Sequence, residues 1–138
     1  MEYFIQTAGY ILEGAGVTLR LFLFTLVFSL PLGFLGAVGK SSGKLLFKAP
    51  LGLYTSVVRG TPLLLQLFFV YYGLPLLIPA LRLERFSAAV LTFIINYAAY
   101  FVEIFRGGIQ SIDRGQYEAA KVLGMNYRQT MLRIVLPQ

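Results

Sequence analysis

Glu103 is the ionisable residue closest to the interior of a long apolar segment, and Arg106 follows three positions later. On a helix, residues three apart lie on the same face, so this carboxylate and this guanidinium can form an ion pair. Ionisable residues inside apolar segments usually face the interior of a helix bundle and merit a functional hypothesis. We therefore expect Glu103 to be paired with Arg106 on an inward-facing side of a helix.

The sequence offers little to an enzyme. It has no histidine and no cysteine, which excludes most zinc sites, Ser-His catalysis, a cysteine nucleophile and a disulfide scaffold. It also has no phosphate-binding P-loop and no cluster of residues spaced as metal ligands. We expect no catalytic residue, no metal site and no cofactor bound by this chain, and an enzyme is the least favoured class.

Composition indicates a membrane protein. Of the 138 residues, 57% are hydrophobic and only 13% are charged, whereas a soluble domain is about one-quarter charged. Charged residues are absent from 21–39, 60–81 and 86–102, and each run approaches the length of about 20 residues that spans a bilayer. A soluble bundle with three buried helices is disfavoured, because its helices would normally show a polar face.

These runs predict three membrane spans at about 17–39, 60–81 and 86–105. The spans should be helical, because a backbone in lipid must satisfy its own hydrogen bonds, and we expect an all-α polytopic bundle. Basic residues collect between the first two runs and after the third, so the positive-inside rule places the N-terminus outside. On this reading the basic excess reflects topology and contact with lipid headgroups, and nucleic-acid binding is disfavoured. The basic residues that orient the chain are Lys40, Lys44, Lys48 and Arg59 in one segment and Arg106, Arg114, Lys121, Arg128 and Arg133 in the other.

The tail after Arg106 is more polar and forms a connection over 106–137. A short helix is predicted from about Gln116 to Leu123, with Asp113 or Gly115 as its N-terminal cap and Gly124 as its stop. The apolar spacing after Met125 indicates the start of a fourth membrane helix. Within the tail runs a pattern of fixed positions: Glu118-Ala119-Ala120, three residues, Gly124, nine residues, Ile134, one residue, and Leu136-Pro137.

This pattern resembles the EAA motif of ABC importer permeases. Three further segments narrow the resemblance to the polar amino-acid permeases: residues 16–19 are similar to the start of their first helix, 59–67 with 71–75 to their second, and 100–109 to their third. Val102 departs from the family, in which alanine is common at that position. Family members also continue past the EAA loop with two more spanning helices. The chain is therefore expected to be a single, partial transmembrane domain over 1–138: a fragment, a truncated product or a partial sequence.

The resemblance implies a multi-pass permease subunit of the bacterial cytoplasmic membrane, in an importer that moves polar amino acids. It implies as partners a cytoplasmic ABC ATPase dimer that binds the ATP and Mg, a second permease subunit, identical or homologous, and an extracytoplasmic solute-binding protein. The short tail helix would fit a cleft of the ATPase and transmit its movement to the spanning helices. The residues expected to couple the two are Glu118, Ala119, Ala120, Leu123, Gly124, Ile134, Leu136 and Pro137.

Other readings stay open at this stage. Glu103 could contact the amino group of a substrate instead of Arg106. Arg59, Thr61 and Gln66 line either the translocation path or a helix interface, and the interface is favoured. The cargo could be another small polar solute such as an opine, and the chain could be a truncated paralogue that does not transport.

Overall fold

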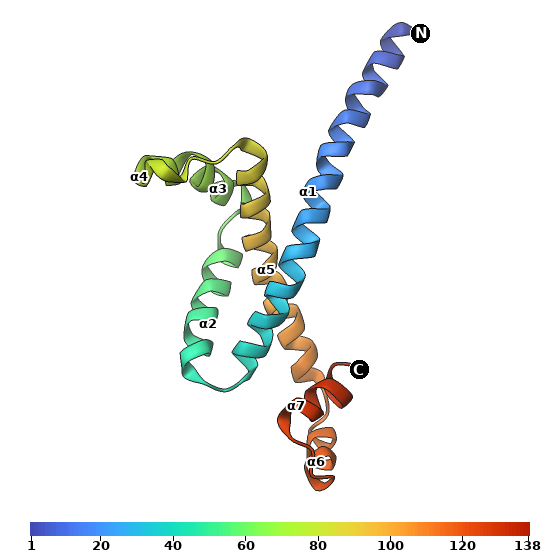
Figure 1. Cartoon of the computed structure of the whole chain (residues 1–138), viewed down its shortest axis with the longest axis vertical. Helices are drawn as coiled ribbons and strands as arrows, with labels where there is room; N and C mark the ends of the chain where they lie inside the picture. Colours follow the sequence, from blue (N-terminus) through green and yellow to red (C-terminus); the bar gives the residue numbers. More distant parts are fainter.

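The computed structural model describes the backbone of residues 1–138 and all side chains except those of Glu2 and Phe4. Within the described residues the regular structure is entirely helical (Figure 1). The α-helices are α1 (Glu2–Ser41), α2 (Leu45–Gly60), α3 (Leu63–Phe68), α4 (Leu74–Leu77), α5 (Arg85–Ser111), α6 (Arg114–Val122) and α7 (Tyr127–Thr130). Shorter turns are the π-helical η1 (Phe69–Gly73) and η3 (Met131–Val135) and the 3-10 turn η2 (Pro79–Leu81).

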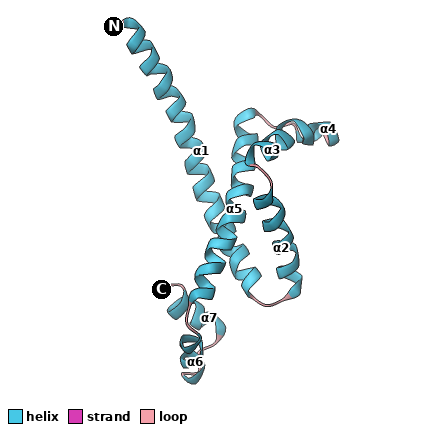
Figure 2. Cartoon of the chain, turned by 180° about the vertical axis from the view of Figure 1, so that it is seen from behind, coloured by secondary structure: helices cyan, strands magenta, loops and turns pink.

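Two long helices, α1 and α5, cross each other and form the centre of the fold (Figures 1 and 2). They meet where α1 carries small residues: a Cβ added at Gly33 would overlap the side chain of Phe101, and one at Gly36 would lie 2.5 Å from Cγ2 of Val102. Ala37, one position further along, is fully buried. The absence of side chains at these positions therefore brings the two backbones close together, as in many membrane helix pairs.

The second predicted span differs from the structure. We expected one helix over 60–81, but α2 ends at Gly60 and the chain turns by 104° before α3 and α4. Pro62 follows directly after Thr61. Because proline has no N–H and disfavours helical geometry in the residue before it, Thr61 is extended and α2 ends. The segment 45–60, which its basic residues led us to read as a connection, is the helix α2. Only the short turn around Gly43, with φ of +73°, joins α1 to α2.

Among the residues that the structure describes, two helices are long and apolar enough to cross a membrane: α1 over Ile5–Ser41, and α5. The bent unit of α2 with α3 and α4 adds a third if it forms one broken span. The first and third predicted spans lie inside α1 and α5. Large apolar side chains along α1 and α3 remain exposed, which fits helices whose outer faces contact lipid or further helices.

Candidate coupling helix and polar sites of the bundle

The predicted tail helix is α6, and its ends explain its length. Asp113 caps the N-terminus by accepting a hydrogen bond of 2.6 Å from the backbone N–H of Gly115. At the other end Gly124 has φ of +71°, and its N–H donates to the carbonyl of Lys121 while that of Met125 donates to Ala120. This pair of bonds is a Schellman motif, which satisfies the last carbonyls and ends the helix.

The predicted coupling residues divide by exposure. Glu118 and Ala119 are exposed on α6, and Leu123 and Gly124, which follow its last residue, are also exposed, with 75% of the Leu123 surface accessible. Ala120 is buried, with 1% exposure, on the opposite side of α6. Further along the tail, Ile134 is half-buried while Leu136 and Pro137 are exposed. The motif therefore supplies both an outward face and an inward anchor.

Tyr117 ties α6 to the end of α5. Its hydroxyl donates a hydrogen bond of 3.1 Å to the carbonyl of Ile109, two residues before α5 ends. Partial burial raises the pKa of Tyr117, with a smaller contribution from Tyr127, so the phenol is held neutral. A cavity of about 480 Å³ lies between the end of α5 and the tail, and Tyr117, Tyr127 and Met131 line it.

Helix α7, near the end of the tail, begins with a well-formed cap. Asn126 accepts a hydrogen bond from the backbone of Gln129, and the Gln129 side chain accepts one from the backbone of Asn126, both at 2.9 Å. This capping box starts α7, which continues into the π-helical turn η3. The predicted start of a fourth membrane helix falls on this short helical stretch over Tyr127–Val135 and stays a prediction.

Glu103 does pair with Arg106, but it also pairs with a second cation. The Nε of Arg106 donates to Oε2 of Glu103 at 2.9 Å. Nζ of Lys40, at the end of α1, donates to Oε1 of the same carboxylate and to Oγ1 of Thr55 in α2, the latter at 2.9 Å. The Glu103 side chain is 14% exposed and that of Lys40 is 15%. Both carboxylate oxygens are thus held by cations from two helices.

The break between α2 and α3 is surrounded by side-chain amides and hydroxyls. Gln66 donates to the carbonyl of Val58 at 2.8 Å and to Oγ1 of Thr61 at 2.7 Å, and Thr61 donates to the carbonyl of Val57. Asn96, buried near the middle of α5, donates to Oε1 of Gln66 at 3.0 Å. Gln66 therefore links the break to α5, Thr61 bonds to the end of α2 and to Gln66, and both residues line a cavity of about 490 Å³.

Arg59 lies in the last turn of α2 and does not join this amide network in the described structure. Its guanidinium carbon lies 5.4 Å from the centre of the Tyr100 ring. This distance is within the range of a cation–π contact, which links α2 to α5 at a second point. Arg59 and Gln66 therefore contact the same face of α5, at Tyr100 and Asn96.

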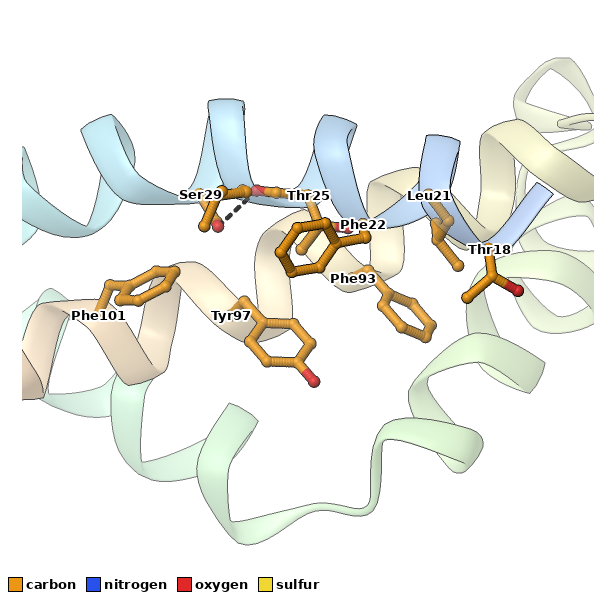
Figure 3. Close-up of a pocket in the computed structure, with 9 residues that line it drawn as sticks. Thr18, Leu21, Phe22, Thr25, Ser29, Phe93, Tyr97 and Phe101 are labelled. Carbon is orange, nitrogen blue, oxygen red and sulfur yellow. Dashed lines mark hydrogen bonds between the residues drawn. The ribbon is translucent and has the colours of Figure 1, made fainter. Parts of the chain in front are cut away.

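A third cavity lies between α1 and α5 (Figure 3). It measures about 290 Å³ and is walled mainly by aromatic rings, with Phe22 from α1 facing Phe93 and Tyr97 from α5. The hydroxyl of Ser29 is turned to the backbone carbonyl of Thr25, where it donates a hydrogen bond. The cavity is therefore suited to apolar groups rather than to a charged ligand.

Sequence reasoning missed the residues that connect helices. Lys40 and Thr55 bind the Glu103 network, Asn96 joins Gln66, and Tyr117 attaches α6. Asn96 gave a usable signal, because an amide inside an otherwise apolar run needs a partner. Lys40 gave none, since the positive-inside rule already accounted for it.

Residues 29–138 match the family described as binding-protein-dependent transport system inner membrane component. The chain belongs to this family. The expected resemblance to amino-acid ABC importer permeases is therefore confirmed at the level of the family.

Individual relatives of this family member are amino-acid permeases by name. The arginine transport system permease protein ArtQ of Bacillus subtilis (strain 168) is 44% identical over 129 residues, covering 94% of this chain and 58% of ArtQ. The "probable amino-acid ABC transporter permease protein PatM" of Vibrio harveyi is 40% identical over 143 residues, covering 99% of this chain and 62% of PatM. The chain thus spans about three-fifths of the length of these relatives.

A solved structure shares the fold. It is described as the crystal structure of an amino acid ABC transporter with histidines, and it superposes with a TM-score of 0.88 at 35% sequence identity. The match covers 98% of this chain and 62% of the other. The arrangement of crossing helices, bent second unit and short tail helix therefore belongs to a fold already seen in an amino-acid transporter.

Proposed function

We propose that the chain is part of the membrane permease subunit of an ATP-driven importer for polar amino acids. The observation that carries this proposal is the similarity in sequence and fold, along almost the whole chain, to permeases and a transporter named for amino acids. Long apolar helices and an exposed, capped tail helix supply the two parts that such a subunit needs.

In this proposal α6 is the contact with a separate ABC ATPase. That ATPase dimer binds the ATP and Mg and performs the hydrolysis, so this chain performs no covalent chemistry. Glu118, Ala119 and Leu123 face the ATPase, because they are exposed on α6 or directly after it. Ala120 holds α6 against its own subunit, and Gly124 turns the chain back toward the bilayer.

The remaining partners follow the same importer architecture. A second permease subunit, identical or homologous, completes the pathway, and an extracytoplasmic solute-binding protein delivers the amino acid. The subunit lies in the bacterial cytoplasmic membrane as a multi-pass protein with its N-terminus outside and with α6 and Lys40 on the cytoplasmic side. ATP-driven closure of the ATPase pair then switches the helices between outward-facing and inward-facing states.

The path residues take different roles. Glu103 is a structural partner of Lys40 and Arg106 rather than a substrate ligand, because cations occupy both of its oxygens. Thr61 and Gln66 lie at the α2–α3 break and line the 490 Å³ cavity. Most of its other lining residues are apolar, so a polar solute there would depend on the side chains of Thr61, Gln66 and Thr92. Discontinuous helices within the bilayer commonly form substrate sites, so this break is the part of the path that we assign to the cargo.

Uptake in proteoliposomes tests the proposal. The complete permease is reconstituted with its ATPase and binding protein, and ATP-dependent uptake of labelled arginine and other polar amino acids is measured against an opine and a sugar. ATP-dependent amino-acid accumulation is the expected result. If only the opine is taken up, the importer carries an opine and the proposed amino-acid cargo is wrong. The 138-residue chain in the same assay tests whether this part transports without further helices.

A further inference from the structure

We propose that Lys40 is a positioning residue of the importer, which links the movement of α6 to α1 and α2 by holding Glu103. This inference rests on the proposed function. The contact of Lys40, Glu103, Arg106 and Thr55 is called the Lys40 clamp below. It goes beyond the expected pairing of Glu103 with Arg106, because that pair lies within α5 and moves nothing else.

The clamp joins three helices at one carboxylate. Glu103 comes from α5, Lys40 from the last turn of α1, and Thr55 from the middle of α2. Lys40 donates to both Glu103 and Thr55, so one ammonium connects all three helices. Thr55 is 2% exposed and the charged pair is about 15% exposed, so water screens this contact much less than a surface ion pair.

A continuous rigid path runs from the clamp to α6. Helix α5 extends without a break from Glu103 to Ser111, and only Ile112 and Asp113 separate it from α6. The side chain of Arg106 donates to Gln110 one turn on, and Tyr117 of α6 donates to the carbonyl of Ile109. A displacement of α6 therefore moves the end of α5, and the clamp passes that movement to the other two helices.

The Lys40 clamp lies beside the crossing of α1 and α5, where it can keep the ends of these two helices together. The two helices are in close contact at Gly33 with Phe101 and at Gly36 with Val102, and the clamp lies four residues beyond Gly36 on α1 and one residue beyond Val102 on α5. Helices in contact at small residues alone can rotate about the contact. An ion pair beside the contact prevents the ends of α1 and α5 from separating, so they move together.

The test compares Lys40→Met, Lys40→Arg and Lys48→Met in the complete importer with its ATPase and binding protein. Lys48 is exposed on the same basic side, so its variant controls for the loss of one positive charge. Amino-acid uptake and ATP hydrolysis are measured in the same proteoliposomes. We expect Lys40→Met to lower uptake per ATP by roughly 2- to 30-fold, the usual range for residues that carry coupling. Lys40→Arg should recover most of the ratio, and Lys48→Met should leave it unchanged.

A second variant keeps the test informative if Lys40→Met fails to assemble. Lys40→Met combined with Glu103→Gln leaves no unpaired carboxylate, so it should insert and hydrolyse ATP while its uptake per ATP stays low. If this double variant recovers the wild-type uptake per ATP, then Lys40 serves only to neutralise the charge of Glu103, and the proposal is overturned. The proposal is also overturned if Lys40→Met has the same uptake per ATP as the wild type, provided that the wild type transports. Absence of ATP-driven uptake in the wild type instead overturns the proposed function, and the clamp with it.

Discussion

The side-chain amide of Asn96 in α5 donates a 3.0 Å hydrogen bond to Oε1 of Gln66 in α3. Asn96 is 4% exposed, so water does not replace this bond if it is lost. Gln66 also donates to the end of α2, and the pair therefore joins the two arms of the bent unit to α5. The angle between α2 and α3 depends on this connection.

A double-mutant cycle should reveal this connection. We expect Asn96→Leu and Gln66→Leu each to destabilise the protein, and the coupling between them to be about 0.6–1.7 kcal/mol, as for other hydrogen bonds between membrane helices. Unfolding in detergent with increasing SDS measures all four proteins. Strictly additive effects of the two substitutions would show that the amides do not act together.

Glu103→Gln should destabilise the bundle. The substitution leaves Lys40 and Arg106 without their carboxylate at positions that are largely buried, and we expect a loss of roughly 1–3 kcal/mol. Thermal unfolding of the detergent-solubilised protein measures the loss. Glu13→Gln changes an exposed carboxylate in the N-terminal part of α1; it is the matched control and should change little.

Gly36→Val should disrupt the crossing of α1 and α5. A Cβ at this position already lies 2.5 Å from Val102, so the helices must separate, at an expected cost of about 1–3 kcal/mol. Gly16→Ala on the same helix is the control, because a Cβ there meets nothing within 4 Å. Comparable losses of stability in the two variants would argue against close packing as the cause.

Gly124→Val should weaken the end of α6. Its φ of +71° is a left-handed conformation that costs an L-residue roughly 1–2 kcal/mol, and a β-branched side chain suffers most. Asparagine tolerates this conformation better, so Gly124→Asn should retain more uptake than Gly124→Val. Membrane insertion should be normal in both variants. Equal uptake by the valine and asparagine variants would contradict a role for the backbone conformation.

Glu118→Lys should uncouple transport without affecting folding. Glu118 is exposed on α6, so reversing its charge changes the outward face and leaves the helix intact. We expect strongly reduced uptake and reduced stimulation of the ATPase by substrate, with normal membrane levels. Gln116→Lys introduces the same charge at another exposed position of α6 and should retain most activity. Normal uptake by Glu118→Lys would remove this residue from the interface.

The sequence predicted the parts of the fold that depend on local chemistry. Apolar runs located α1 and α5, and the cap at Asp113 with the glycine at Gly124 located α6 to within two residues. It failed at α2, because Lys44 and Lys48 at its start resembled a connecting loop, and Gly60–Pro62 was taken as the start of a span rather than a break. A bend angle depends on contacts with α5, which a one-dimensional pattern does not contain.

In the candidate sites too, contacts within one helix were predictable from the sequence and contacts between helices were not. The pairing of Glu103 with Arg106 was predictable, since both residues lie on one helix three positions apart. The contact of Glu103 with Lys40 was not, because it joins residues that are distant in sequence and depends on how α1 crosses α5. Contacts between helices therefore required the structure.

The break after Gly60 has a consequence for how a solute meets the protein. A helix that stops inside a bilayer exposes peptide oxygens to hydrocarbon, where no solvent can satisfy them. Here the hydroxyl of Thr61 donates a hydrogen bond to the carbonyl of Val57, and the amide of Gln66 donates one to the carbonyl of Val58, as water would do in solution. The carbonyls at the end of α2 are thus satisfied by side chains of the same chain. In the proposed importer, a polar amino acid at this break would exchange hydrogen bonds with these side chains instead of losing all of its partners to hydrocarbon.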